Sequence, residues 1–269
     1  MSGSDLASYI SFVGKNHFAA FGVWAPPDWK TEDMFLAAIL DSGSRVIQKI
    51  DTPLRQFDNF VKRKDIQYPG TFLPTYFDSA AICLGYGCDT VYALTHHSIE
   101  TRYILNSGKY KAPANIIFGF SPNMGARKRM SEEKYNYIIH LLAPIETREY
   151  LFLHFSLKGY MYLAAFNKFK GETTVFRKKG IVRYGVVVNV YDIGFKNDLD
   201  GGLDFYPRWI NLKGDVWIAA YNSFELKSEL TKSRQSHNAK YPEKHKSLIQ
   251  LANKLNETDN PVLVIVHVK

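Results

Sequence analysis

The most constraining feature of this sequence is the recurrence of short runs of β-branched and aromatic residues, each bounded by Gly, Asn, Asp or Lys. Such runs are typical of antiparallel strands, because extended backbone accommodates residues branched at Cβ and tight turns need conformationally tolerant residues. The runs fall into groups of about four strands, with approximate limits of residues 8–51, 72–105, 135–177 and 186–268. Strands expected within these groups include residues 80–84, 90–94, 135–145, 160–167, 186–191, 205–212 and 216–221. Helical spacing is scarce, so the sequence predicts an all-β chain.

Short turn sequences join the strands within these groups, which indicates an up-and-down order. Examples are Asp41-Ser42-Gly43-Ser44, Gly85-Tyr86-Gly87, Thr95-His96-His97 and Leu157-Lys158-Gly159. Recurring quartets of this kind indicate the blades of a β-propeller. A β-sandwich is the alternative, although it usually places about seven to nine strands in roughly 100 residues. We therefore expect a β-propeller-like fold.

The length of the chain limits the number of blades. Its 269 residues could hold six blades of about 40 to 45 residues each. Only about four strand groups are present, because residues 109–133 read as a long polar loop and one helix lies near the C-terminus. That helix is predicted from Pro242 at its first position and from the apolar spacing of Leu248, Leu251, Ala252 and Leu255. The expectation is one partial or open propeller-like domain over residues 1–269.

The charge balance suggests partners without identifying one. The chain has 34 Lys and Arg against 26 Asp and Glu, a formal net charge of +8, which suits nucleic acid, acidic glycans or an anionic membrane surface. The basic residues form separate patches between apolar runs, where solvated loops are expected, and no nucleic-acid recognition motif accompanies them. No apolar run approaches the roughly 20 residues of a membrane helix. The first residues also lack the pattern of a secretory signal.

Several segments carry a family resemblance. They are residues 89–92, 101–105 and 150–153, the run Phe195-Lys196-Asn197-Asp198-Leu199-Asp200-Gly201-Gly202 with Phe205-Tyr206-Pro207, and the terminal run Asn260-Pro261-Val262-Leu263-Val264-Ile265-Val266. These segments resemble a family of six-bladed β-propeller proteins, often lipoproteins, from the cell envelope of gut anaerobic bacteria, with propellers related to NHL and TolB-type repeats. The resemblance covers about residues 70–269. It implies an extracytoplasmic location but no catalytic residues.

Members of that family are commonly longer than this chain. They begin with a signal or lipidation segment and extra N-terminal blades, so this chain resembles their C-terminal portion. The resemblance thus implies a periplasmic or cell-surface protein, with no signal peptide expected in the given chain.

Aromatic side chains supply the main argument for ligand binding. They make up 14% of the chain, with 4 Trp, 17 Tyr and 18 Phe. Aromatic faces stack on sugar rings, but they also pack blades against one another, and both interpretations stay open. The candidate ligand-binding residues are Trp24, Trp29, His96, His97, Arg102, Tyr206, Arg208 and Trp209.

The adjacent pair His96-His97 is a weaker candidate for binding a metal or ligand. No HExxH frame or cysteine partner accompanies it. Because neighbouring strand residues point to opposite faces, both rings would serve one metal only through loop geometry. An ordinary surface turn is the alternative.

Three carboxylates, Asp198, Asp200 and Asp204, surround the pair Gly201-Gly202. An oxygen-rich loop of this kind attracts calcium, although the spacing is not that of an EF-hand. The alternative is a turn in which the Asp side chains accept hydrogen bonds from backbone amides. No other cofactor is expected.

Motifs of common enzyme classes are missing. The sequence has no G-x-S-x-G elbow and no complete dinucleotide loop. Cys83 and Cys88 are consistent with a disulfide across a hairpin or with two free thiols.

From the missing enzyme motifs and the family resemblance, we expect a non-enzymatic binding module of the bacterial envelope for a glycan, peptide or protein. The alternative is a hydrolase or lyase acting on carbohydrate or ester, with a cation at Asp198 and Asp200, and nucleic-acid binding through the basic loops is a third.

Overall fold

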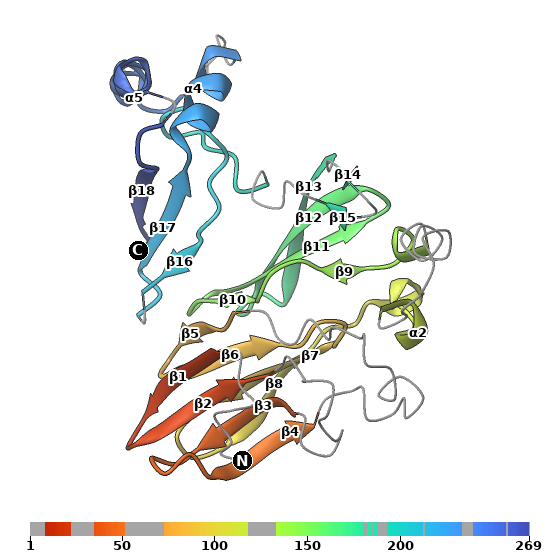
Figure 1. Cartoon of the computed structure of the whole chain (residues 1–269). Coiled ribbons are helices and arrows are strands. Elements are labelled where there is room, and N and C mark those ends of the chain that lie inside the picture. The colour runs from red at the N-terminus through yellow and green to blue at the C-terminus, as the bar shows by residue number, and fades with distance from the viewer. Residues whose placement is uncertain are drawn as a thin grey trace.

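The structure is a computed structural model of the chain, and it describes residues 9–22, 35–51, 73–117, 133–179, 182–183, 186–187, 193–211, 213–232, 239–256 and 258–268. Antiparallel sheets dominate, and they follow one another in chain order (Figure 1). The sheets of the described residues remain separate from each other. The predicted all-β, propeller-like fold class is thus confirmed, with an open arrangement of blades.

The first two sheets agree with the first two predicted groups. Both run up and down in simple order. The first contains β1 (Tyr9–Gly14), β2 (His17–Phe21), β3 (Phe35–Leu40) and β4 (Val46–Asp51). The second contains β5 (Thr75–Phe77), β6 (Ala80–Leu84), β7 (Thr90–Leu94) and β8 (Ile99–Ile104). Hairpin turns with left-handed backbone at Lys15-Asn16 and Asp78-Ser79 explain why consecutive strands pair.

Small residues allow these two sheets to approach each other. Ala19 and Ala37 from the first sheet and Ala81 from the second belong to one buried cluster, together with Phe21 and Leu94. Burial of such apolar surface away from water stabilises the pairing of the sheets.

The third sheet departs from its prediction at its start. It contains β10 (Ile145–Glu146), β11 (Tyr150–Leu157), β12 (Tyr160–Asn167) and β13 (Glu172–Lys179), while β9 (Ile139–His140) pairs separately with β11. The prediction of one strand over residues 135–145 is therefore wrong. Pro144 precedes β10 and has no N–H to donate to a ladder, which is one reason that the segment does not form a continuous strand.

The fourth sheet has three strands rather than four. They are β16 (Trp209–Ile210), β17 (Val216–Tyr221) and β18 (Val262–His267). The predicted strand over residues 205–212 is shorter in the structure, because Phe205 instead forms an isolated bridge with Phe195 and Pro207 interrupts the run. The described part of the predicted strand 186–191 is β15 (Val186–Val187), which pairs with β14 (Val182–Arg183) outside the fourth sheet.

Two helices follow the fourth sheet's central strand, and only one was predicted. The predicted helix is α5 (Pro242–Lys254), with Pro at its start. The additional helix is α4 (Ser223–Lys232), and Figure 1 shows both near one end of β17. Leu226 and Leu230 of α4 are buried with Ala252 of α5. The sequence signal for α4 was Asn222 followed three residues later by Glu225. In the structure the Asn222 backbone N–H donates to the Glu225 carboxylate at 3.4 Å, which is one of the two hydrogen bonds of a capping box.

The predicted loop over residues 109–133 contains short helical turns in its described part. These are a 3₁₀ turn at Gly108–Tyr110 and α2 (Ala114–Ile117). Residues 118–132 lie outside the described residues.

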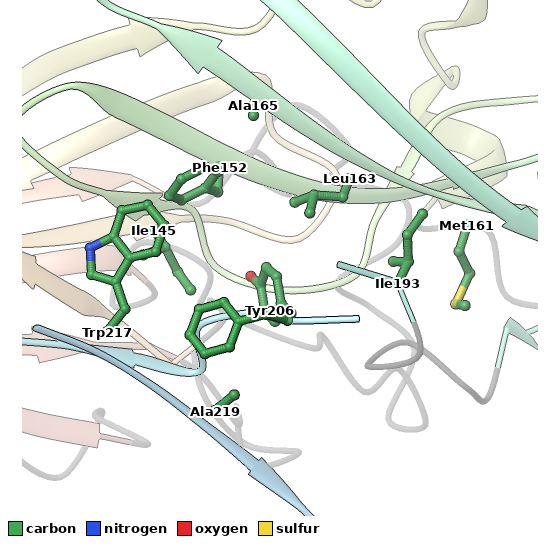
Figure 2. Packing of buried hydrophobic residues seen from close by; sticks show 10 residues of the cluster. Ile145, Phe152, Met161, Leu163, Ala165, Ile193, Tyr206, Trp217 and Ala219 are labelled. Carbon is green, nitrogen blue, oxygen red and sulfur yellow. The ribbon is translucent and has the colours of Figure 1, made fainter. Parts of the chain in front are cut away.

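The largest core lies between the third and fourth sheets. Figure 2 shows Phe152 and Leu163 of the third sheet facing Trp217 and Ala219 of the fourth. The rings of Phe152 and Trp217 pack edge to face, with centroids 5.3 Å apart at 81°. Such contacts add to the stabilisation from burial alone. Part of the aromatic content therefore serves packing between sheets.

Candidate functional site: a cleft lined by the first strand of each sheet

A cleft of about 640 Å³ is lined by residues in or beside β1, β5, β10 and β16, the first strands in the pairing order of the four main sheets. Figure 1 shows β1, β5, β10 and β16 on the same side of the molecule. The lining residues are Tyr9, Leu73, Pro74, Thr75, Tyr76, Leu142, Ala143, Ile145, Tyr206, Arg208, Trp209 and Ile210. The volume lies within the roughly 300 to 1,000 Å³ of small-ligand pockets.

The lining combines exposed apolar surface with few charges. Trp209, Leu73 and Tyr9 are 55%, 71% and 39% exposed. In the sheet register Ile210 lies opposite the core residue Trp217, and both Ile210 and the more exposed Trp209 line the cleft. The cleft is thus open at an aromatic edge.

Two hydrogen bonds between segments hold one side of the cleft. The Tyr76 hydroxyl donates to Ser11 Oγ, which joins β5 to β1. Burial raises the pKa of Tyr76 to about 12. The Thr75 hydroxyl donates to the Pro144 carbonyl oxygen at 2.5 Å, which joins β5 to the segment before β10. These bonds fix three of the four first strands relative to each other.

Tyr206 is a buried lining residue and packs against a buried histidine. It is only 4% exposed, and its ring centroid lies 4.0 Å from that of His154 in β11. His154 is 1% exposed, and neither of its ring nitrogens has a hydrogen-bond partner of ordinary geometry among the described residues. Burial lowers the pKa of His154 to about 4. This histidine is therefore neutral near pH 7 and supports the cleft as an apolar group.

The described residues of the lining are mostly apolar or aromatic. Among the described residues that line it, Arg208 is the one charged side chain, and none of them is a carboxylate, a histidine or a cysteine. Nucleophilic catalysis needs an activated nucleophile beside a base, and glycoside hydrolysis needs two carboxyl groups. Neither arrangement occurs among the lining residues that the structure describes.

The structure brings three of the predicted ligand-binding residues together in this cleft, namely Tyr206, Arg208 and Trp209. Trp24 and Trp29 lie outside the described residues. The sequence analysis missed Tyr9, Leu73 and Tyr76. Their shared signal was position, because each lies in or beside the first strand of its group.

Arg102 lies elsewhere, in an ion-pair cluster between the second and third sheets. Its Nε and Nη2 donate to the Glu146 carboxylate at 3.2 and 3.0 Å. The Tyr103 hydroxyl and Lys168 Nζ donate to the same carboxylate at 2.7 and 2.9 Å. Burial acts to raise the pKa of Glu146, but these hydrogen bonds outweigh it and hold the pKa below its usual value. Arg102 therefore joins two sheets and does not line the cleft.

His96 and His97 occupy the turn between β7 and β8, also away from the cleft lining. Their ring centroids are 3.6 Å apart. Desolvation, together with the positive field of His97, Lys15 and His17, lowers the pKa of His96.

Asp198, Asp200 and Asp204 lie in the segment before β16 and outside the cleft lining. Asp200 Oδ1 accepts hydrogen bonds from Asn197 Nδ2 at 2.7 Å and from the Gly202 amide at 2.9 Å. Burial raises the pKa of Asp204. Within the described ranges, no three His, Cys, Asp or Glu residues are placed to hold a metal ion. The calcium site stays a prediction.

The two cysteines are free thiols in the structure. Burial raises the pKa of both, and that of Cys88 to about 12. Neither is therefore an activated nucleophile.

Comparison with known proteins places the chain in a family. No curated protein matches it. It is similar to a solved structure from Bacteroides fragilis NCTC 9343 described as a "Putative exported protein", with a TM-score of 0.58 and 14% sequence identity. The match covers 98% of this chain and 66% of that one, and at this identity the likeness shows the fold alone. In the part of the chain that the structure describes, no helix is long and apolar enough to cross a membrane. The family model described as "Domain of unknown function (DUF4934)" matches residues 35–267, so the chain belongs to this family.

Proposed function

We propose that this chain is a non-enzymatic binding module whose ligand occupies the cleft between the first strands. One observation carries the proposal: four sheets from distant parts of the sequence contribute to one cleft that exposes Trp209 and Tyr9 beside Arg208. Concave sites with aromatic walls and few polar groups are the usual form of small-ligand sites.

The enzyme alternative has less support from the geometry. A hydrolase acting on carbohydrate or ester requires acids, bases or nucleophiles near the ligand. The described part of the cleft lining does not supply those groups, and Asp198 and Asp200 lie outside it. Nucleic-acid binding also has less support, because the described lining residues include a single cation, Arg208.

We further propose that the module acts in the bacterial envelope, outside the cytoplasm. The resemblance to NHL- and TolB-like envelope lipoproteins supports this location. The fold likeness to a Bacteroides protein described as exported adds support.

The cleft is tested by screening the full chain against glycan and peptide arrays and then measuring the Kd of each hit for two variants. Trp209→Ala removes the exposed indole of the cleft. Phe169→Ala removes an aromatic side chain that is 71% exposed and lies outside the cleft lining. We expect Trp209→Ala to weaken hits at least tenfold and Phe169→Ala to leave them unchanged. Equal binding by both variants would refute the cleft as the ligand site. Turnover of a bound glycan or ester would support the enzyme alternative.

A further inference from the structure

We infer that two copies of this chain associate through β18, whose outer edge pairs antiparallel with β18 of a second copy about a two-fold axis. The inference goes beyond ligand binding in the cleft and does not depend on it. It is carried by the unpaired edge of β18, by the charges on the other outermost strands and by a register in which β18 complements itself.

The backbone of β18 has a free side. Among the described strands, β18 pairs only with β17, and Figure 1 shows it at the margin of the fourth sheet. The Val268 N–H donates to the Asp215 carbonyl oxygen at 2.9 Å, so this residue directs its backbone groups toward β17. Because the direction alternates along an antiparallel strand, Leu263, Ile265 and His267 direct their N–H and C=O groups away from β17. These groups can pair with another strand.

The outermost strands of the other sheets resist such pairing. They are β4, β8 and β13, and each contains charged residues, namely Lys49 and Asp51, Glu100 and Arg102, and Glu172, Arg177 and Lys178. Natural proteins use charges on edge strands to prevent pairing with other chains. From Val262 to His267, β18 contains neither a charged residue nor a proline. Of these four edges, β18 is thus the one that its sequence leaves open to pairing.

The strand order of the sheets offers a position for an added strand. The first two sheets have four strands in chain order, whereas the fourth sheet has three among the described residues. A strand placed beyond β18 would give the fourth sheet the same number as the first two. A β18 strand from a second copy fits this position.

An antiparallel register centred on Ile265 makes β18 complementary to itself. Ile265 lies opposite Ile265 of the second copy, and Leu263 lies opposite His267 of the second copy. Each of these pairs joins residues whose backbone groups point outward, so each can exchange two interstrand hydrogen bonds. The two-fold axis uses the same edge on both copies, and association therefore closes at a dimer.

The same register places apolar side chains on matching faces. Leu263 and Ile265 are 58% and 56% exposed on one face of β18. On the other face, Val264 and Val266 pack against the core between the third and fourth sheets. In the dimer, Val264 lies beside Val266 of the second copy and extends this core. Removal of the exposed apolar surface from water favours the pairing.

The test is sedimentation equilibrium of the full chain from about 5 to about 300 μM, because a small interface gives weak association. We expect a reversible equilibrium between monomer and dimer. Residue-resolved hydrogen exchange at both ends of the series locates the interface. The amides of Leu263, Ile265 and His267 should exchange at least threefold more slowly at the high concentration. The amides of Val264 and Val266 face β17 and should change little.

Charged variants at the two-fold axis test the register. Ile265→Lys and Ile265→Glu each place two like charges opposite one another, so each should raise the Kd of the dimer at least tenfold. An equimolar mixture of the two places Lys opposite Glu and should restore association as a heterodimer. Because the side chain of Ile265 is 56% exposed, both variants should fold, and thermal unfolding checks this.

The matched controls are Val175→Lys and Val175→Glu. Val175 is 51% exposed and lies on β13, another outermost strand. These variants introduce the same charges at a different sheet edge. They should leave the Kd of the dimer unchanged.

Four results would overturn the inference. The first is a chain that stays monomeric at the highest concentration. The second is protection of the Leu263, Ile265 and His267 amides at every concentration, which would mean that another segment of the same chain covers the edge. The third is a dimer that Ile265→Lys does not weaken, because it would use another surface. The fourth is a mixture of the Lys and Glu variants that fails to associate, because the symmetric register requires these residues to meet.

Discussion

Arg102 Nη2 lies 3.0 Å from Glu146 Oε1, and this ion pair connects the second sheet to the third through a carboxylate whose side chain is completely buried. Lys168 Nζ approaches the same oxygen at 2.9 Å. Two cations and the Tyr103 hydroxyl therefore compensate for the removal of one carboxylate from water. The contact fixes β8 against β10, and β10 in turn contributes Ile145 to the cleft.

Replacing Glu146 by Gln should destabilise the protein. The variant keeps the size of the side chain but leaves Arg102 and Lys168 without their anion. The expected loss in the free energy of unfolding is about 3 kcal/mol. This value is at the lower end of the losses measured when a buried ion pair is broken, because both cations keep some contact with water. Urea denaturation measures it. Glu100→Gln, at an exposed strand position, should change the free energy by less than about 0.5 kcal/mol. Similar values for the two variants would contradict a stabilising role for the cluster.

Acid should destabilise the fold before most carboxylates titrate. Burial lowers the pKa of His154 and of His140 to about 4, from 6.5. A histidine whose pKa is lower in the folded than in the unfolded protein resists protonation only in the folded state. Its contribution to the free energy of unfolding is complete above pH 6.5, the unfolded pKa, and is lost as the pH falls from 6.5 toward 4. At pH 5 the loss is about 2 kcal/mol for each histidine. Urea unfolding at pH 7.5 and pH 5 measures it.

The variant His154→Phe isolates one of these two contributions. It keeps an aromatic ring against Tyr206 and removes the titrating group, so the difference between pH 7.5 and pH 5 should shrink by about 2 kcal/mol. His267→Gln changes an exposed histidine on β18 and is the control. An unchanged pH dependence in His154→Phe would show that His154 does not resist protonation.

The contact between α4 and α5 should depend on Leu226. This side chain is 2% exposed, whereas Leu251 on α5 is 41% exposed. Leu226→Ala should lower the free energy of unfolding by about 3 kcal/mol because it leaves a cavity. Leu251→Ala should cost less than about 1 kcal/mol, since half-exposed apolar surface loses less on truncation. Denaturation in urea compares them, and equal losses would argue against the packing of α4 on α5.

Both cysteines should resist alkylation in the folded protein. Burial raises the pKa of Cys83 and Cys88, so almost no thiolate is present at pH 8. Iodoacetamide should label them at least about tenfold more slowly than in guanidinium, where both thiols are exposed. Mass spectrometry follows the labelling. Loss of the two thiol hydrogens in the native protein would reveal a disulfide instead of free thiols.

Elements specified by local pattern were predicted well. The strands Ala80–Leu84, Thr90–Leu94, Tyr160–Asn167 and Val216–Tyr221 have the limits that the sequence predicted. In each case a run of strand-forming residues stops at turn residues, and both signals are local. The start of α5 at Pro242 follows from the same kind of signal.

Elements that depend on distant partners were predicted poorly. The segment over residues 135–145 is apolar and aromatic enough for a strand, yet only Ile139–His140 and Ile145–Glu146 pair with β11. The helix α4 was missed because its apolar positions become a buried face only against α5. Arg102 was expected to bind a ligand, and its partner Glu146 lies in another sheet.

The sequence by itself determined the strands of the first two sheets and their up-and-down order, because β-branched runs and tight turns act over a few residues. It also predicted Tyr206, Arg208 and Trp209 as ligand-binding residues, a cluster that the structure places in one cleft. Only the tertiary structure decided that Tyr9 and Tyr76 join this cluster while Arg102, His96 and His97 do not. The reason is physical: the cleft arises from the way four sheets pack, and that packing depends on contacts between residues far apart in the chain.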